Sequence, residues 1–80
     1  MDARNGLRKM VTSLLASKGD TEPFGDEELL LSGGRLESIS VIELITYMEE
    51  VHGVDFAERG FDPDEFDSIE TMLALLAESG

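Results

Sequence analysis

Residues 36–53 read LESISVIELITYMEEVHG, and this stretch decides what kind of fold the chain can form. Apolar side chains recur in it at the spacing of a wide helix face, at Ile39, Val41, Ile42, Leu44, Ile45, Met48 and Val51. Glutamates separate the apolar residues, and Gly53 follows as a helix stop signal. We therefore predict an amphipathic helix from Ile39 to His52.

Upstream of this helix, the pattern predicts a first helix over about residues 2–17, followed by a long loop. The apolar stripe of the first helix recurs at i, i+3, i+4, i+7 and i+8, at Leu7, Met10, Val11, Leu14 and Leu15. Gly19 is the expected stop signal, and residues 19–37 contain too many glycines and prolines for a regular element. A loop of this length needs apolar anchors. We expect these to be Phe24, Leu29, Leu30, Leu31 and Leu36.

Downstream, the sequence predicts one short helix and a longer final one. The short helix fits near Asp55 to Arg59, and the aromatic and aliphatic side chains around it are expected in the core, namely Val54, Phe56, Phe61 and Phe66. Asp67 and Glu70 have the spacing of a capping box, so the last helix should begin at Asp67 and continue to about Glu78. The predicted fold is all-α, a small helical bundle of three main helices plus one short helix, with the long loop between the first two.

The chain has 80 residues, enough for a single domain over residues 1–80, and its charge is unevenly distributed. The formal net charge is −12, of which residues 1–18 contribute about +3 and residues 19–80 about −15. Such an acidic surface repels a phosphate backbone, so we expect no nucleic-acid binding, and the short apolar runs argue against membrane insertion. The N-terminal residues lack the pattern of a secretory signal, which makes the cytoplasm the expected location.

No set of side chains has the spacing of a catalytic or metal site. The only histidine, His52, would lie roughly 21 Å along the same helix from Ser38, too far to act as its base. Asp62, Asp64 and Glu65 lack the spacing and turn glycine of a calcium-binding loop. Without cysteine, any thiol chemistry must be brought in on a cofactor. We therefore expect a protein that is not an enzyme and has no metal site.

The stretch from Leu36 to Leu44 lies just after the loop and at the start of the acidic helix. It resembles the attachment site of the acyl carrier protein family, in which Asp-Ser-Leu is followed, four residues after the serine, by an apolar residue and then Glu-Leu. The matching positions here are Ser38, Ile39, Ile42, Glu43 and Leu44. Residues 53–56 and 61–69 resemble the family's turn after its second helix and the approach to its last helix. The resemblance thus covers the chain nearly end to end.

This resemblance implies that Ser38 carries a 4′-phosphopantetheine arm, flanked by Glu37 and Ile39, whose thiol holds an acyl or aminoacyl group as a thioester. The implied partners are a phosphopantetheinyl transferase, a ligase or synthase that loads the cargo, and downstream transferases. The family's docking surface would be formed here by Ile42, Glu43, Glu49 and Glu50. A serine in the first turn of a helix suits a phosphate, because unpaired N–H groups and the positive end of the helix dipole face it. We expect a monomeric, stand-alone carrier.

Two residues depart from the family pattern, and a second serine imitates it. Glu37 stands where the family usually has aspartate. Glutamate is the weaker N-cap, so we expect a less sharply defined helix start and either weaker recognition by a general transferase or a dedicated one. Tyr47 is predicted to be a core ring with its hydroxyl at the surface. Asp67-Ser68-Ile69 matches the motif more literally, but the mostly apolar helix after it indicates a core element with Asp67 and Ser68 as caps.

The sequence leaves two alternatives to a carrier. One is an acidic helical adaptor that has the carrier fold but no prosthetic group, and Glu37 is the residue that favours it. The other is an acidic inhibitor that mimics nucleic acid through its charge. For a carrier, the cargo stays open between fatty acyl, β-ketoacyl, aminoacyl and D-alanyl groups.

Overall fold

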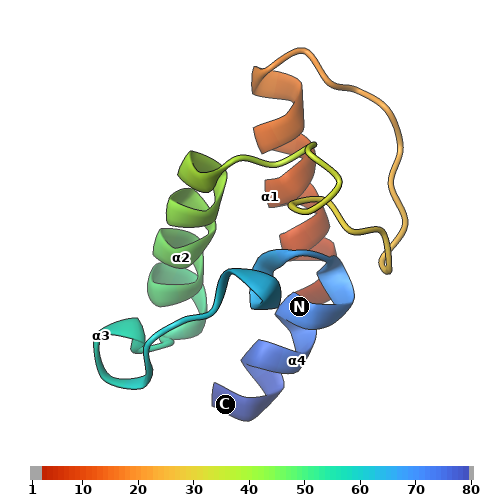
Figure 1. The fold of residues 1–80 in the computed structure, drawn as a ribbon. Helices are drawn as coiled ribbons and strands as arrows, with labels where there is room; N and C mark the ends of the chain where they lie inside the picture. Colours follow the sequence, from red (N-terminus) through yellow and green to blue (C-terminus); the bar gives the residue numbers. More distant parts are fainter. Residues whose placement is uncertain (1–2, 80) are drawn as a thin grey trace.

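The structure, a computed structural model, describes residues 3–79, which form a bundle of helices (Figure 1). Along the chain these are α1 (Ala3–Ser17), α2 (Ser38–His52), α3 (Phe56–Arg59) and α4 (Ile69–Ser79), with a 3₁₀ turn, η1 (Pro63–Phe66), before α4. The described residues contain no strand. The predicted all-α bundle with its long loop between the first two helices is confirmed, whereas η1 was not predicted. The predicted first residue of α1, Asp2, lies outside the described residues.

Glycines end α1 and α2, as predicted. Gly19 has a φ of 82° and Gly53 a φ of 69°, left-handed conformations that residues with a side chain rarely adopt. After α1, the N–H of Asp20 donates to the carbonyl oxygen of Leu15 at 2.9 Å. After α2, the N–H of Gly53 donates to the carbonyl oxygen of Met48. These bonds satisfy carbonyl groups that a helix end leaves open, so the two glycines determine where the helices stop.

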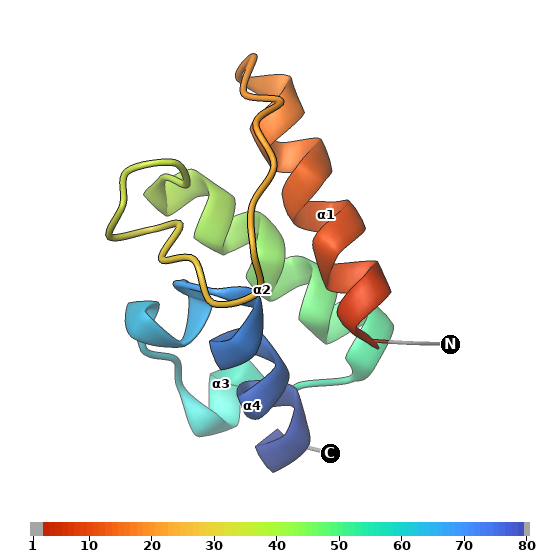
Figure 2. The same cartoon turned by 90° about the vertical axis from the view of Figure 1, so that its right-hand side faces the viewer.

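Helices α1 and α2 run in opposite directions (Figures 1 and 2). Near the start of α1, Gly6 lies against the hydroxyl of Tyr47 in the second half of α2. Just beyond the end of α1, Lys18 pairs with Glu37, which precedes α2, with 3.4 Å between Nζ and Oε2. This ion pair links the residue that follows α1 to the residue that precedes α2.

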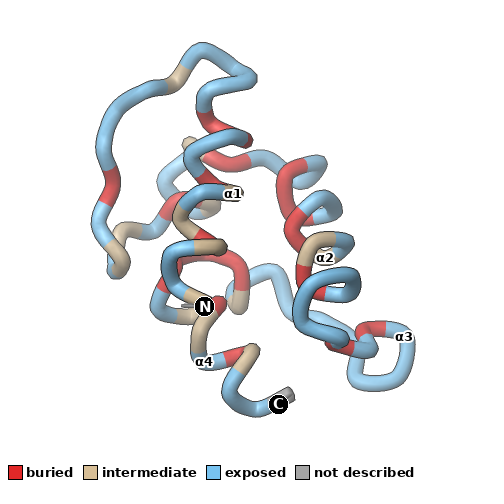
Figure 3. Tube along the Cα trace, turned by 180° about the vertical axis from the view of Figure 1, so that it is seen from behind, coloured by how far each residue is buried: buried red, intermediate tan, exposed pale blue. Residues whose placement is uncertain are grey.

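The core fills the space between the longer helices and η1. The buried positions of the helices face inward, toward one another (Figure 3). The largest fully buried side chains come from α1, the long loop, α2, η1 and α4, and include Leu7, Leu15, Leu30, Leu44, Met48, Phe66, Ile69, Met72 and Leu75. Burial of apolar surface contributes about 25 cal/mol per Å², and it is the main force that holds this cysteine-free chain together.

The apolar face of α2 is wider than the part that the core covers. One stripe is buried, at Val41, Leu44 and Met48, and three other apolar residues are more than half exposed, namely Ile39, Ile42 and Val51. A helix that packs on one side buries a stripe of about 100°, so these three stay at the surface. The predictions that Leu29 and Phe61 are core anchors are also wrong, because both side chains are exposed. No helix within residues 3–79 is long and apolar enough to cross a membrane.

Both apolar and charged side chains hold the long loop. The remaining predicted anchors are buried or half-buried, namely Phe24, Leu30, Leu31 and Leu36. Arg35, near the end of the loop, donates hydrogen bonds to earlier loop residues: the carboxylates of Asp20 and Glu28 and the carbonyl oxygens of Glu22 and Pro23. Because one guanidinium binds four positions, the loop has a defined path despite its lack of regular structure.

Helix α4 begins at Ile69, two residues later than predicted, and Ser68 caps it instead of Asp67. The Oγ atom of Ser68 accepts a hydrogen bond from the N–H of Thr71, and Oγ1 of Thr71 accepts one from the N–H of Ser68, both at 3.1 Å. The two residues therefore cap the helix reciprocally. The predicted capping box of Asp67 and Glu70 is wrong, because the long loop occupies the Asp67 carboxylate.

Candidate functional site at the start of α2

Ser38 is the first residue of α2, and its side chain is exposed to solvent. The preceding residue, Glu37, is extended, with φ −116° and ψ 170°, and its side chain makes no capping hydrogen bond. The carbonyl oxygen of Glu37 accepts hydrogen bonds from the N–H groups of Ser40 and Val41, at 2.9 and 3.2 Å. The Ser38 hydroxyl therefore lies at a helix start without a side-chain cap, where the positive end of the helix dipole faces solvent.

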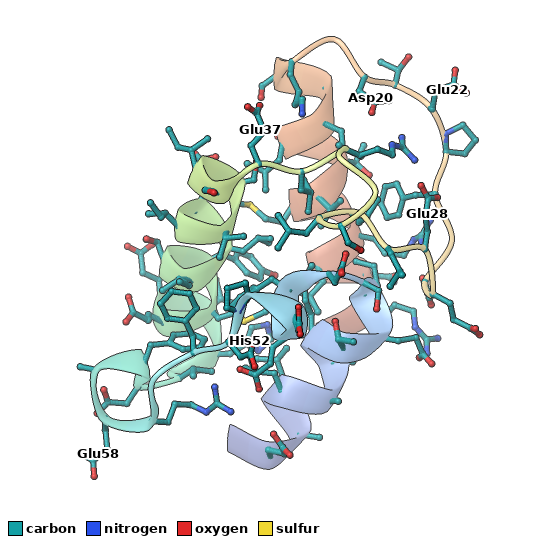
Figure 4. The ribbon with its side chains drawn as sticks, viewed as in Figure 1. Asp20, Glu22, Glu28, Glu37, His52 and Glu58 are labelled. Atoms are coloured by element: carbon teal, nitrogen blue, oxygen red, sulfur yellow. The ribbon has the colours of Figure 1, made fainter. Side chains whose placement is uncertain are left out.

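The Glu37 side chain extends toward the end of α1 (Figure 4). Its carboxylate pairs with Lys18, whose Nζ also donates to the carbonyl oxygen of Arg35 at 2.6 Å. As predicted for a glutamate at this position, Glu37 provides no side-chain cap. Helix α2 nevertheless begins at Ser38, one residue before the predicted start. Sequence reasoning missed the role of Lys18, for which the available signal was a basic residue directly after the first predicted helix.

An apolar hollow of about 280 Å³ adjoins Ser38. Its walls come from the long loop, the first turns of α2 and the segment around the start of η1, and they are Leu31, Ser38, Val41, Ile42, Phe61 and Pro63. Only Ser38 among these has a polar side chain. Phe61, predicted to lie in the core, lines this hollow and packs edge-on against Phe66, with ring centroids 6.1 Å apart. An apolar group attached to Ser38 would therefore have a surface beside it on which to pack.

Ile39, predicted to flank the attachment point, and the predicted docking residues lie on exposed positions of α2. Ile39 and Ile42 are one and four residues after Ser38 and are 66% and 61% exposed. Three acidic residues are also exposed, namely Glu43, Glu49 and Glu50. At 1.5 Å per residue, Glu49 lies roughly 16 Å along the helix from Ser38. The isoleucines are thus near the serine, and the acidic residues extend the exposed surface away from it.

Tyr47 contacts α1. Its ring packs against the core, as predicted, and its hydroxyl lies against Gly6. The ring of His52 meets the Tyr47 ring edge-on, with centroids 5.7 Å apart. Because His52 ends α2 and Ser38 begins it, these two residues do not form a joint site.

Ser68, the second serine in a matching sequence, is only 2% exposed. Its hydroxyl caps α4, as described above. An enzyme that modifies serine needs access to the hydroxyl oxygen, which the fold prevents here. Of the two serines, Ser38 alone is exposed.

The acidic residues around η1 have structural contacts. Asp62 accepts a hydrogen bond from the N–H of Asp64 at 3.0 Å, and Glu65 accepts one from the N–H of Asp62 at 3.1 Å. Hydrogen bonding to Arg59 lowers the pKa of the Glu65 carboxyl group, against the opposing effect of burial. Within residues 3–79, no group of three histidine or acidic side chains is arranged to hold a metal ion.

A comparison with models of known protein families finds no match to this chain, and a comparison with curated proteins finds none either. A function is therefore inferred from Ser38, from the residues around it and from the order of the helices. The geometry brings the exposed hydroxyl, two exposed isoleucines and the apolar hollow together at one end of α2.

Proposed function

We propose that the chain is a carrier protein and that Ser38 is the attachment point of a 4′-phosphopantetheine arm. The observation that carries this proposal is the position of Ser38, whose hydroxyl is exposed at the start of α2 beside the apolar hollow. The resemblance of residues 36–44 to the acyl carrier protein family supports the same residue. In this role the chain is not an enzyme, since it presents a group on which enzymes act.

Attachment is one phosphoryl transfer, for which the partner transferase supplies the base. The Ser38 oxygen attacks the phosphorus of coenzyme A that bears the pantetheine, and the bond from that phosphorus to the bridging oxygen breaks. The serine proton passes to the transferase base, and adenosine 3′,5′-bisphosphate leaves. The bound arm supplies a thiol that holds the cargo as a thioester. The N–H groups at the start of α2 favour the negative charge of the phosphodiester.

The lining of the hollow supports an apolar cargo. None of its residues carries a charge, and burying an ammonium group against such a surface would cost free energy without a partner to offset it. Fatty acyl or related groups therefore fit the hollow better than aminoacyl or D-alanyl groups.

Partner enzymes would bind the exposed side of α2. Ile39 and Ile42 offer apolar contact close to Ser38, and Glu43, Glu49 and Glu50 offer negative charge. Charged surfaces of this kind speed encounter with basic patches and select partners more than they add affinity. Weak, brief contact of this type suits a carrier that must leave each enzyme after transfer.

A second candidate function is that of an acidic adaptor with the carrier fold and no prosthetic group. Glu37 favours it, because its side chain is one methylene longer than the aspartate of the family pattern and its carboxylate is paired with Lys18. The exposed isoleucines would then bind a partner protein directly.

Intact-protein mass spectrometry tests the proposal. The purified chain is incubated with coenzyme A, Mg²⁺ and a broad-specificity phosphopantetheinyl transferase. We expect the wild type and Ser68→Ala to gain the mass of one arm and Ser38→Ala to gain none. Failure of the wild type to gain the arm from several transferases would favour the adaptor. A gain of the arm's mass by Ser38→Ala would show that the attachment site is another residue.

A further inference from the structure

Three consecutive residues of the long loop bind Asp67, which lies between η1 and α4. The N–H of Leu30 donates to the backbone carbonyl oxygen of Asp67 at 2.6 Å. The N–H groups of Leu31 and Ser32 donate to Oδ1 at 2.8 and 3.0 Å, and the hydroxyl of Ser32 donates to Oδ2 at 2.7 Å. Leu31 and Ser32 therefore occupy both carboxylate oxygens, although they lie 36 and 35 positions before Asp67 in the sequence.

Asp67 is only 9% exposed, and its carboxylate is bound by these loop residues. Burial alone would raise the pKa of Asp67, but hydrogen bonds from the N–H and hydroxyl of Ser32 and from the N–H of Leu31 outweigh it and lower the pKa. The group is ionised at neutral pH, and hydrogen bonds to an ionised acceptor are stronger than those between neutral groups. Its removal would leave the amides of Leu31 and Ser32 without their acceptor.

One of the residues that Asp67 holds is a wall of the hollow beside Ser38. Leu31 is the one lining residue that comes from the long loop. The other lining residues belong to α2 and to the segment around the start of η1. Val41 and Ile42 are fixed by the hydrogen bonds of α2. Leu31 lies in a turn of the loop, where its carbonyl oxygen accepts from the N–H three residues later at 3.1 Å, and its own N–H is bound by the Asp67 carboxylate. The Asp67 carboxylate is therefore the side-chain contact that ties this wall to the segment before α4.

We propose that Asp67 is a positioning residue for the Ser38 site, which sets the width of the apolar hollow by holding Leu31 and thereby controls how a group attached to Ser38 packs there. The first step, control of the hollow, stands on the contacts above alone. The second step, control of an attached group, rests on the proposed carrier function.

The first step is tested by solution NMR on the unmodified protein, with the soluble nitroxide TEMPOL as probe. In Asp67→Ala we expect the broadening of the Leu31 and Val41 methyl signals by TEMPOL to rise about twofold or more. The methyl signals of Leu44 and Met72, both fully buried, should stay as in the wild type. Amide exchange at Leu31 and Ser32 should accelerate about tenfold or more. In the wild type these amides exchange only after their hydrogen bonds to the charged carboxylate break, and the variant lacks those bonds.

Milder variants keep the test decisive if Asp67→Ala loses its fold. Ser32→Ala removes only the bond to Oδ2, and Asp67→Asn keeps an oxygen acceptor but removes the charge. Both should give intermediate exchange rates at Leu31. Asp64→Ala, which removes an exposed acid from η1 without touching the loop, should match the wild type. Unchanged Leu31 exchange and broadening in folded Asp67→Asn and Ser32→Ala would overturn the proposal.

The second step is tested by attaching a hexanoyl arm from hexanoyl coenzyme A to the wild type and to Asp67→Asn. In the wild type, the hexanoyl group should shift the Leu31 and Val41 methyl signals relative to the unacylated arm, and in Asp67→Asn these shifts should be at least halved. Equal shifts in both proteins would overturn this step. If the wild type accepts no arm, the carrier function fails instead, while the TEMPOL result on the unmodified protein still decides the role of Asp67.

Discussion

Arg35 binds Asp20 through two parallel hydrogen bonds, from Nε to Oδ2 and from Nη2 to Oδ1, each 3.0 Å long. The pair joins the end of the long loop to its beginning, because the two residues are 15 positions apart. Arg35 also donates from Nη1 to Oε2 of Glu28 at 2.9 Å. Since only two residues separate Arg35 from Ser38, these bonds fix the approach of the chain to α2.

Replacement of Arg35 should lower the melting temperature in a graded way. Arg35→Lys keeps the charge but loses the planar fork that binds Asp20 at two points, and Arg35→Met leaves Asp20 and Glu28 unpaired. We therefore expect the order wild type, Arg35→Lys, Arg35→Met, from highest to lowest, by circular dichroism at pH 7. Lys9→Met, which removes one exposed positive charge from α1, is the matched control and should melt close to the wild type. A melting temperature of Arg35→Lys equal to that of the wild type would show that the fork adds nothing.

Acidification should destabilise the fold below about pH 4. Hydrogen bonding to Arg35 lowers the pKa of Asp20. A carboxyl group whose pKa is lower in the folded than in the unfolded chain stabilises the fold fully above its unfolded pKa, near 4. It loses that contribution as the pH falls through the folded value. Urea midpoints measured from pH 7 to pH 2.5 should therefore fall below pH 4, and less steeply in Asp20→Asn. Identical slopes in the two proteins would contradict this assignment.

The positions of the long helices were predictable because their signals are local. An apolar stripe followed by Gly19 or Gly53 specifies a helix and its end within a few residues. The start of α4 was not predictable in this way. Asp67 and Ser68 can both cap a helix, and the neighbouring residues do not distinguish them. Only the packed fold shows that loop residues 31 and 32 already occupy the Asp67 carboxylate.

The candidate site was predictable in part for the same reason. Ser38 and the residues around it form a continuous motif, so a resemblance could single them out. The hollow beside Ser38 is formed by segments far apart in the sequence, and nothing local in Leu31 or Phe61 indicates that they meet there. An aromatic residue in a small domain is usually buried, which is why Phe61 was predicted in the core.

Ser68→Ala should lower the free energy of unfolding by about 1 kcal/mol, because it removes the side-chain cap of α4. Ser38→Ala should stay within about 0.5 kcal/mol of the wild type, since the Ser38 side chain is exposed. Urea denaturation of both variants under the same conditions gives the comparison. Equal destabilisation of the two would mean that one of these serines has been assigned the wrong contacts.

Gly6→Ala should destabilise the wild type and stabilise a Tyr47→Phe background. A Cβ at Gly6 would collide with the hydroxyl oxygen of Tyr47, and the stiff ring has little freedom to move away. Without that oxygen, the higher helix propensity of alanine remains, worth up to about 1 kcal/mol. A double-mutant cycle by urea denaturation should give a coupling energy of about 1 kcal/mol or more. Additive effects would contradict the contact between α1 and α2 at this point.

Charge reversal on α2 should slow loading of Ser38 if partners read its acidic residues. Glu43→Lys and Glu49→Lys place positive charge on the exposed side of the helix, and we expect the kcat/KM of a phosphopantetheinyl transferase to fall about threefold or more at low ionic strength. The fall should come mainly from KM, because neither residue contacts the hydroxyl that reacts. The loss should shrink in 0.5 M salt, where exposed charges are screened.

The matched control for this prediction is Glu22→Lys, which makes the same change of net charge in the long loop, away from α2 (Figure 4). If net charge alone steers the encounter, Glu22→Lys will slow loading as much as Glu49→Lys does. If α2 is the docking surface, Glu22→Lys will load at the wild-type rate while the two α2 variants do not. Wild-type kinetics for all three variants at low salt would reject α2 as an electrostatic docking surface, and recognition would then depend on Ile39 and Ile42, whose exposed side chains adjoin the serine.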